Sequence, residues 1–307
     1  MMKCSKCGGL AVINLTQHRL RLCGEHFVQW VVTMTQRTIE KYEMFTPDDQ
    51  ILVAVSGGKD SLALWDVLLE LGYQAEGMYI RLGIDEGIEY SDKSLEMCQK
   101  FVAQHRPGAA LRVVDLSKEY GQNVPWLART KHRGRGKPCA VCGLVKRHIM
   151  NSTARDGGFA AIATGHNMDD EVAVLMQNTL HWQAGYLARQ APVLHEQNGL
   201  ARKVKPFVRL YERETAAYAL VRDSDYIYDE CPFARGSTTN FYKELLNRLE
   251  LNSPGAKQQF YLQFLESRDS GRVRFAEMEP GALHPCSRCG QPTTAGDLCA
   301  FCRLWES

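Results

Sequence analysis

A glycine-rich turn between a buried strand and a helix constrains the fold of this chain more than any other feature. Residues Ile51–Val55 form an apolar, β-branched run typical of a buried strand, and Leu62–Leu71 repeat apolar residues at helical spacing. The turn between them reads Ser56-Gly57-Gly58-Lys59-Asp60-Ser61. Two glycines let the backbone turn tightly and point its N–H groups at an anion, and the start of a helix adds further donors. The pattern therefore predicts a phosphate-binding loop at the end of a strand.

The same alternation of strands and helices continues through the chain. We expect further strands at Ala75–Leu82, Leu111–Leu116 and Phe159–Ala163, and helices at Val28–Tyr42, Asp92–His105, Val141–Arg155, Asp169–Leu180, Glu212–Arg222 and, with a break at Ser253–Gly255, Asn240–Arg268. Strands separated by helices of this length predict right-handed crossovers and an open parallel sheet covered on both faces. Of the 307 residues, 45% are hydrophobic and 23% charged, which excludes a disordered or fibrous protein.

The side chains of the turn suit nucleotide chemistry. Lys59 offers a point charge for phosphate, and Asp60 makes sense if Mg²⁺ accompanies the phosphates. The turn matches neither the longer loop that ends in Gly-Lys-Ser/Thr nor the Gly-x-Gly-x-x-Gly fingerprint of dinucleotide sites. It resembles the PP-loop of ATP pyrophosphatases, which split ATP between its α- and β-phosphates. The alternative is a strand–helix turn without chemical function.

The other strand ends should complete this site, because ligands of parallel sheets collect at the carboxyl ends of the strands. Ile80 ends the second expected strand and should lie beside the adenine or in the core. After the fourth strand, Gly165 allows close approach of a nucleotide, and Asp170 is expected as a second metal-binding or acid–base carboxylate. The expected ATP contacts are Ala54, Ser56, Gly57, Gly58, Lys59, Asp60, Ser61, Ile80, Lys146 and Gly165.

The cysteine pattern predicts metal sites at both ends of the chain. Eleven cysteines without a secretion signal indicate metal ligation in a reducing, intracellular compartment, which we expect to be the cytoplasm. The N-terminal ligands are expected to be Cys4, Cys7, Cys23 and His26, and the C-terminal ligands Cys286, Cys289, Cys299 and Cys302. Four such ligands suit tetrahedral zinc, which organises segments too short for their own core. No apolar run approaches the ~20 residues of a membrane helix, so we expect no membrane association.

These motifs divide the chain into five expected parts. We predict an N-terminal zinc finger at 1–30, a linker helix at 31–50, a catalytic domain at 51–240, C-terminal helices at 241–280 and a C-terminal zinc finger at 281–307.

Three central cysteines, Cys139, Cys142 and Cys231, allow three interpretations. In the first interpretation, Cys139 and Cys142 at the start of a helix form a redox dithiol that carries a persulfide, and Cys231 assists. As three thiolate ligands, they would hold an iron–sulfur cluster with one iron free of protein ligands. In the third interpretation they form a structural zinc site, but an obvious fourth ligand is missing, and His148 is a poor candidate for it. Cys98 is the remaining cysteine, and we expect its side chain to be buried and to pack in the core.

Lys146 follows Cys142 by four residues and falls on the same face of the expected helix. A lysine at this position can neutralise phosphate charge or simply face solvent. A basic run upstream of the cysteines suits phosphate contacts with RNA, although a solvated charge run is the alternative. Its expected RNA contacts are Arg129, Lys131, Arg133 and Arg135. The net charge of +2 neither requires nor excludes a nucleic-acid partner.

Taken together, the motifs resemble the TtcA/TtuA family of tRNA 2-thiolation enzymes over nearly the whole length of the chain. The motifs that carry the resemblance are SGGKDS, PCAVCGLVKR (Pro138–Arg147), ATGHNMDDE (Ala163–Glu171), DECPFARG (Asp229–Gly236) and the two terminal cysteine groups. The terminal groups favour the TtuA branch, which acts on 5-methyluridine at tRNA position 54. Relatives that act on the wobble uridine share much of the pattern.

The resemblance implies a fold, cofactors and partners. It implies the parallel sheet of PP-loop ATP pyrophosphatases (adenine nucleotide hydrolase-like), flanked by two zinc knuckles. By the resemblance, Cys139, Cys142 and Cys231 hold a 4Fe-4S cluster, and Asp60, Lys146 and Asp170 are catalytic. It further implies ATP with Mg²⁺, two Zn²⁺, a tRNA substrate, a ubiquitin-like thiocarboxylated sulfur carrier and a homodimer.

The implied reaction is adenylation of the uridine C2 oxygen by ATP, followed by its replacement with sulfur. Two alternatives from other classes compete with it. An adenylating ligase or amidotransferase-like pyrophosphatase explains the SGGKDS turn but leaves the three central cysteines without a role. A non-enzymatic, nucleotide-binding zinc-knuckle RNA-binding protein explains the ends of the chain and the basic run, but not Lys146 and Asp170 together.

Overall fold

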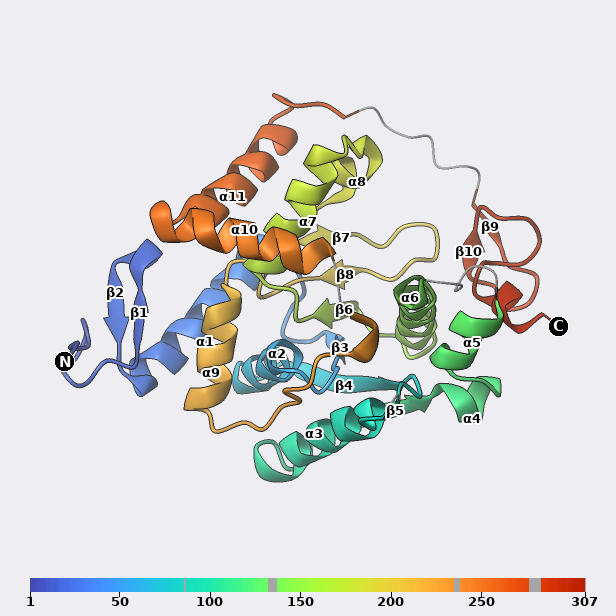
Figure 1. Cartoon of the computed structure of the whole chain (residues 1–307), viewed down its shortest axis with the longest axis horizontal. Coiled ribbons are helices and arrows are strands. Elements are labelled where there is room, and N and C mark those ends of the chain that lie inside the picture. The colour runs from blue at the N-terminus through green and yellow to red at the C-terminus, as the bar shows by residue number, and fades with distance from the viewer. Residues whose placement is uncertain (86, 132–136, 235–237, 276–282, 307) are drawn as a thin grey trace.

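A six-stranded, mostly parallel sheet forms the centre of the described structure (Figure 1). The computed structural model describes residues 1–85, 87–131, 137–234, 238–275 and 283–306. The strands of the sheet are β3 (Gln50–Ala54), β4 (Gln74–Arg81), β5 (Leu111–Asp115), β6 (Ala161–Thr164), β7 (Val193–Leu194) and β8 (Lys203–Val204). Their order is β5-β4-β3-β6-β8-β7, and only the edge pair β7–β8 is antiparallel among them. The expected open parallel sheet is therefore confirmed, with one antiparallel edge strand added.

Side chains of the central strand β3 alternate between two apolar cores. Ile51 and Val53 belong to one buried cluster, whereas Leu52 belongs to another, because successive side chains of a strand point to opposite faces. The first core contains residues of α1 (Gly24–Lys41), α2 (Lys59–Glu70), α3 (Tyr90–Gln104) and α9 (Glu212–Val221). The second contains residues of α4 (Leu116–Tyr120), α5 (Val124–Thr130) and α6 (Pro138–Asp156). The strands are consequently covered on both faces, as the run of buried residues predicts.

A third apolar cluster lies beside the sheet. It contains residues of α7 (Met168–Leu180), α8 (Ala184–Arg189), α10 (Thr238–Asn252) and α11 (Ala256–Asp269). All helices and strands expected from the sequence are present, with bounds that differ by a few residues. The sequence analysis missed the short elements α4, α5, α8, β7 and β8, because elements of two to seven residues carry too little periodicity to be recognised.

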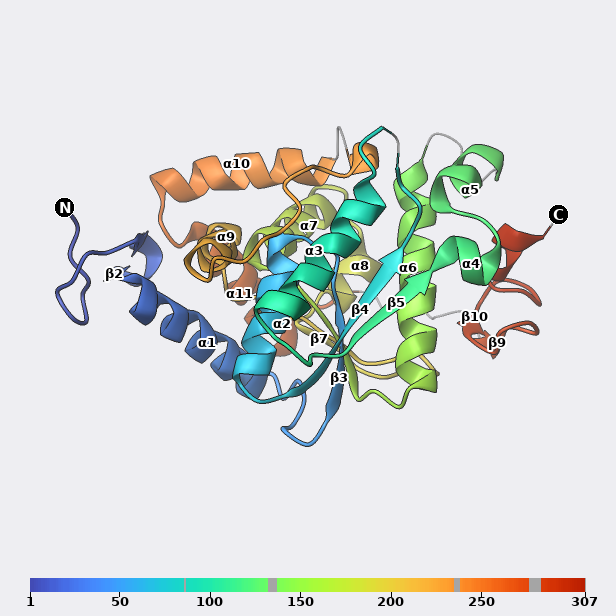
Figure 2. The same cartoon turned by 90° about the horizontal axis from the view of Figure 1, so that it is seen from below.

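The two cysteine-rich ends lie at opposite ends of the molecule (Figures 1 and 2). Their small elements are the hairpin β1 (Ile13–Leu15) and β2 (Leu20–Leu22) with η1 (Thr16–His18), and the pair β9 (His284–Pro285) and β10 (Pro292–Thr293) with η3 (Cys302–Trp305). Apolar residues of the N-terminal hairpin join the first core, and those of the C-terminal segment join the second. Among the described residues, the helices are too short or too polar to cross a membrane.

The strand order places a switch point between β3 and β6. From β3 the chain proceeds to β4 and β5 on one side, whereas β6, β8 and β7 lie on the other. Helices that leave adjacent strands in opposite directions open a crevice at the carboxyl ends of these strands, where open α/β sheets bind their ligands. The SGGKDS turn follows β3, and Thr164-Gly165 ends β6. The topology therefore brings both sequence motifs to one crevice.

A buried acid, Glu214, ties the N-terminal hairpin to this framework. Its carboxylate accepts hydrogen bonds from the Tyr211 backbone N–H (2.8 Å) at the start of α9 and from the Gln17 side chain (2.5 Å). Burial raises the pKa of Glu214 to about 7, although the Tyr211 N–H and Arg213 oppose this shift. The folded protein thus holds a proton that the unfolded chain releases near its ordinary pKa of 4.5.

We expect the contribution of Glu214 to the stability of the protein, up to ~3 kcal/mol, to fall as pH rises from about 5 to about 8. The sign follows because unfolding releases a proton between the two pKa values, so that higher pH favours the unfolded chain. Glu214→Gln should remove this component of the pH dependence in urea unfolding, because glutamine does not titrate. Its side-chain oxygen can accept from the Tyr211 N–H, and its NH2 group can donate to the Gln17 side-chain oxygen once the Gln17 amide is turned over. The matched control Glu244→Gln changes an exposed acid of α10 and should keep the wild-type dependence. Equal pH dependence in both variants would contradict this assignment.

Candidate active site

The turn after β3 has the geometry of an anion-binding loop. Gly57 has a φ of +74°, and a Cβ at this position would lie 2.3 Å from the Ser94 carbonyl oxygen, so that only glycine fits. The Ser61 hydroxyl donates to the Gly58 carbonyl oxygen (3.0 Å) and accepts from the Ser56 N–H (3.0 Å). Helix α2 begins directly after the turn and points its free N–H groups to the same place.

The loop that follows β6 touches this turn. A Cβ on Gly165 would lie 2.9 Å from backbone atoms of Asp60, so the two chain segments approach as closely as their backbones permit. Asn167 joins them further, because its side-chain amide donates to Asp60 Oδ1 (3.2 Å). The structure therefore brings Asp60 and Gly165 together, as the strand-end argument predicts.

A chain of alternating charges runs across the two loops. Lys59 Nζ contacts Asp60 Oδ2 (3.0 Å) and Glu212 Oε1 (2.8 Å). Lys243 Nζ contacts Glu212 Oε2 (3.0 Å) and Asp170 Oδ1 (2.6 Å). Asp170 is also part of a capping box, in which it accepts a hydrogen bond from the Asn167 N–H (3.0 Å). One network thus holds the PP-loop lysine and both predicted catalytic carboxylates.

The protonation of this network follows from burial and pairing. Burial acts to raise the pKa of Glu212, but the hydrogen bond from Lys59 and the charge of Lys243 outweigh it and lower the pKa to about 2. Burial opposes the charged form of Lys243, yet Asp170 and Glu212 raise its pKa. For Asp60, burial raises the pKa, with Lys59 and Thr215 offsetting part of the effect. Glu212 and Lys243 are therefore ionised at neutral pH, whereas burial disfavours the charged form of Asp60.

Sequence reasoning missed Glu212, Lys243, Thr215 and Asn167. The Thr215 hydroxyl donates to Asp60 Oδ1, from a helix more than 150 residues further along the chain. Glu212 stands in the first turn of α9, where an acid is common for helix-dipole reasons alone, so the sequence offered no sign of its second role. Asn167 is the N-cap residue of α7, and that signal could have been noticed in the sequence.

A pocket opens beside the turn. Its walls include four predicted ATP contacts, Ala54, Ser56, Ile80 and Lys146. Tyr90, Ser94 and Met150 complete the wall from α3 and α6. Ile80 is buried and belongs to the second core, so it both lines the pocket and packs in the core. Lys146 therefore faces the PP-loop pocket rather than open solvent.

The three central cysteines lie around the start of α6. Cys139 Sγ donates to the Phe233 carbonyl oxygen (3.2 Å) in η2 (Pro232–Ala234), the element that follows Cys231. Burial raises the pKa of the Cys142 thiol, Lys146 opposes the shift, and Cys231 adds to it. Within the described parts of the chain, the three sulfurs are not gathered as tightly as ligands of one metal ion. A single zinc ion bound by all three sulfurs would bring them within about 4 Å of one another, so the structure does not favour the structural zinc interpretation.

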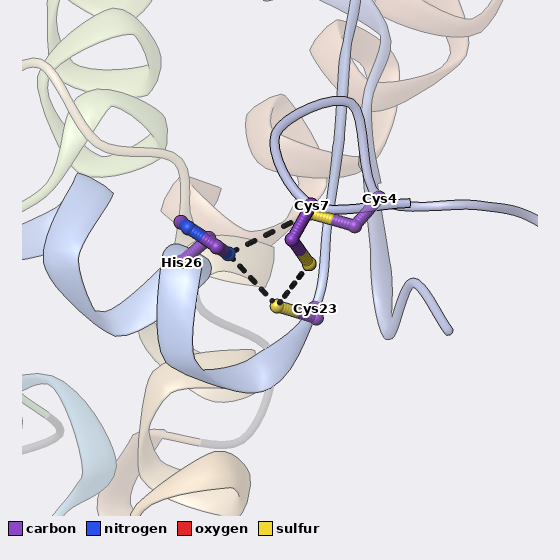
Figure 3. A group of neighbouring side chains, drawn as sticks. All are labelled: Cys4, Cys7, Cys23 and His26. Atoms are coloured by element: carbon purple, nitrogen blue, oxygen red, sulfur yellow. Dashed lines mark hydrogen bonds between the residues drawn. The ribbon is translucent and has the colours of Figure 1, made fainter. Parts of the chain in front are cut away.

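The N-terminal ligands form a compact group (Figure 3). Cys7 Sγ lies 3.8 Å from Cys23 Sγ, and Cys23 Sγ lies 3.1 Å from His26 Nδ1. Zinc–sulfur bonds of about 2.3 Å in a tetrahedron place two sulfurs about 3.8 Å apart. Cys4, the buried member, completes the group, and its sulfur lies 3.8 Å from His26 Nδ1. The arrangement fits one tetrahedral ion.

The C-terminal ligands form the second compact group and pack against α6. Cys289 Sγ lies 3.8 Å from Cys299 Sγ. For Cys286, burial acts to raise the pKa of the thiol, but backbone N–H groups, foremost that of Cys299, lower it to about 6 and so favour the thiolate that binds metal.

His148 of α6 serves this packing. Its ring is stacked on that of Phe301, with centroids 3.6 Å apart and an interplanar angle of 5°. Gln291 donates to the His148 backbone carbonyl oxygen (3.0 Å). Burial, together with Arg155, lowers the pKa of His148 to about 4. His148 is thus engaged with the C-terminal segment, which weakens the interpretation of it as a fourth ligand to the central cysteines.

The predicted RNA contacts are only partly described. Arg129 is exposed at the end of α5, and Lys131 contacts the Glu306 carbonyl oxygen of the C-terminal segment. Arg133 and Arg135 lie outside the described residues. Cys98 is fully buried in the first core, where burial raises its pKa to about 12, and its expected packing role is confirmed.

Comparisons with known proteins agree with this geometry. Residues 3–28 match the family described as 2-thiouridine synthetase TtuA, N-terminal LIM domain, and residues 31–248 match the PP-loop domain. The chain is 49% identical to the tRNA-5-methyluridine(54) 2-sulfurtransferase of Thermus thermophilus, over 100% of this chain and 92% of that protein. It is 42% identical to the protein of the same name in Pyrococcus horikoshii, over 99% and 94%. The chain belongs to this family of PP-loop tRNA sulfurtransferases.

The same fold occurs in the U34-tRNA thiolase NcsA from Methanococcus maripaludis, solved with its [4Fe-4S] cluster. The two structures superpose with a TM-score of 0.79 at 21% sequence identity, covering 99% of this chain and 95% of that one. The similarity confirms the expected PP-loop fold. Membership of the tRNA sulfurtransferase family also decides against the non-enzymatic RNA-binding alternative.

Lys243→Met should weaken ATP binding about tenfold, equivalent to ~1.4 kcal/mol. The variant keeps the length of the side chain but leaves Asp170 and Glu212 without a shared cation beside the PP-loop, so that the site repels phosphate. Isothermal titration calorimetry measures the change. Lys100→Met, which removes a lysine paired with Glu96 on α3, is the matched control and should leave ATP affinity unchanged. Unchanged affinity in Lys243→Met would refute the electrostatic role of this lysine.

Cys7→Ser should lower the zinc content of the purified protein from two ions per chain to one, measured by elemental analysis. Cys7 is exposed, so the substitution disturbs little apolar packing. Cys98→Ala removes a cysteine outside both groups and should leave the zinc content at two. A zinc content independent of Cys7 would contradict the N-terminal site.

Proposed function

We propose that this protein replaces the C2 oxygen of a uridine in tRNA with sulfur at the expense of ATP. One observation carries the proposal most directly. Lys146 lines the same pocket as Ser56 of the PP-loop and lies one helical turn from Cys142. Cys142 thus lies one helical turn from a residue of the pocket, and this supports a reaction that uses both the nucleotide and the cysteines. The ligase alternative gives the three cysteines no role.

The favoured target is 5-methyluridine at position 54. The support is the name shared by the relatives at 49% and 42% identity, which both match nearly the full length of the chain. The wobble uridine is the alternative, because the structural relative at 21% identity is a U34-tRNA thiolase.

In the proposed first step, the uridine O2 attacks the α-phosphate of ATP, and pyrophosphate leaves. The oxygen is thereby converted from a poor leaving group into part of AMP. Lys59 of the PP-loop and Lys146 of the pocket wall offset the charge that develops on the phosphates. In the second step, sulfide adds to C2, and AMP departs with the former O2. The displaced oxygen thus ends in AMP, and no oxidant or reductant is consumed.

Cys139, Cys142 and Cys231 would hold the 4Fe-4S cluster; the support is the family motif and the contact of Cys139 with the Phe233 carbonyl oxygen in η2, next to Cys231. When bound, the cluster supplies one iron that no protein ligand occupies and that can bind sulfide. The alternative without a cluster is a persulfide on one of these thiols. Asp60 and Asp170 are hard oxygen donors at the PP-loop and would hold Mg²⁺ beside the phosphates.

The partners stay predictions of the family resemblance. They are a thiocarboxylated ubiquitin-like sulfur carrier, the tRNA with its contacts in the basic run near Arg129, and a second copy of the chain in a homodimer.

The proposal is tested by incubating the anaerobically purified protein with ATP, sulfide and an unthiolated tRNA, and by analysing the nucleosides by mass spectrometry. We expect 2-thiolation at position 54.

Cys142→Ala should abolish thiolation while ATP binding survives, whereas Asp60→Ala should stop pyrophosphate release with the iron content intact. Loss of ATP binding in Cys142→Ala, or normal pyrophosphate release in Asp60→Ala, would refute this division of roles. A colourless protein that still thiolates with sulfide would exclude the cluster and indicate direct attack of sulfide on C2, whereas the persulfide route would need a donor of already oxidised sulfur.

A further inference from the structure

The connection between α9 and η2 passes directly over the PP-loop. Its residues 222–231 leave α9, run past α3 (Figure 1) and lead into η2, which contacts α6. The Ile227 N–H donates to the Gly57 carbonyl oxygen (2.9 Å), so the segment is attached by its backbone to the turn itself. Asp229 pairs with Lys93 of α3 (3.5 Å) and fixes the far side. This connecting segment thus joins the nucleotide loop to the third central cysteine.

Two tyrosines flank the attachment point and differ in burial. Tyr226 is half-buried and packs against the first core. Tyr228 is 73% exposed, and its ring lies over that of Tyr226 with centroids 4.3 Å apart and an interplanar angle of 37°. Burying one face of a large ring against a fixed neighbour holds the ring in place, while the other face stays free. Tyr228 is therefore a supported aromatic surface on the segment that leads from the Gly57 contact to Cys231.

The charge of the connecting segment limits what can lie on that surface. The connecting segment, residues 222–231, contains four acids, Asp223, Asp225, Asp229 and Glu230, and its basic residue Arg222 pairs with Asp66 of α2. Such a segment repels the phosphate backbone of a nucleic acid, which binds to basic side chains. The face of an unstacked base is uncharged, so it can stack on an aromatic side chain whatever the charge of the residues nearby. Of the parts of an RNA, only the base suits this position.

We propose that Tyr228 stacks on a base of the RNA substrate and holds it between the PP-loop and the central cysteines, with Tyr226 as its support. The inference rests on the proposed function and adds the residue that receives the base. An enzyme that reacts at a base atom must take the base out of its stack, which costs a few kcal/mol. Stacking of the extruded base on an aromatic side chain of the protein recovers part of this free energy.

The test compares Tyr228→Ala, Tyr228→Phe and Tyr186→Ala in the anaerobic protein with unthiolated tRNA, ATP and inorganic sulfide. Tyr186 is an exposed tyrosine of α8 and serves as the matched control. Stacking on a base contributes roughly 1–3 kcal/mol, or about 5- to 150-fold, so kcat/KM for tRNA should fall by that factor in Tyr228→Ala. The affinity for tRNA, measured by fluorescence anisotropy, should fall with it. Tyr228→Phe and Tyr186→Ala should stay within about twofold of the wild type, and ATP affinity should be unchanged in all three.

Three results would overturn the proposal. Wild-type tRNA kinetics in Tyr228→Ala would exclude a stacking role. A loss of ATP affinity in that variant would show that the ring only maintains the PP-loop. A defect that appears with a thiocarboxylated carrier protein as donor, but not with sulfide, would assign the ring to the carrier. If instead the wild type thiolates no tRNA, the proposed function fails, and that outcome is distinct from a Tyr228 variant that matches an active wild type.

Discussion

The contact between the loops after β3 and β6 is the constraint on which the site depends. These strands are neighbours in the sheet, and their following helices lie in different apolar clusters. Gly165 lets the second loop approach the Asp60 backbone to a distance at which a Cβ would clash. Gly57 in turn fits beneath the Ser94 carbonyl of α3. The PP-loop is therefore held from two sides by backbone, which is stiffer than side chains and keeps its N–H groups pre-aligned.

Around this framework, the site is held by charges that satisfy one another. Lys59 and Lys243 are shared among Asp60, Glu212 and Asp170, with the low pKa of Glu212 as the sign of strong pairing. Two carboxylates contact the Lys59 ammonium group, which has three N–H donors, so a phosphate bound to Lys59 shares the positive charge with Asp60 and Glu212. Anion binding and the position of Asp60 are therefore coupled, since both depend on the same ammonium group.

The two terminal cysteine groups stabilise different halves of the molecule. The N-terminal hairpin contributes Leu15 and Leu22 to the first core, whereas the C-terminal segment contributes Phe301 and Leu304 to the second. The latter packs on α6, the helix that also carries Cys142 and Lys146. The C-terminal group therefore supports the helix that presents two of the candidate site residues, although it lies at the edge of the molecule.

The sequence by itself determined the strand–helix alternation, the PP-loop and the two terminal ligand groups. Each of these is local: apolar periodicity indicates an element, two glycines allow a tight turn, and two pairs of ligands spaced two residues apart are typical of a zinc site. The tertiary structure alone decided that Glu212, Thr215 and Lys243 reach Asp60 and Asp170, because these contacts join segments that no short-range pattern relates. It also decided which face of Tyr228 is free, since burial depends on the whole chain around a ring.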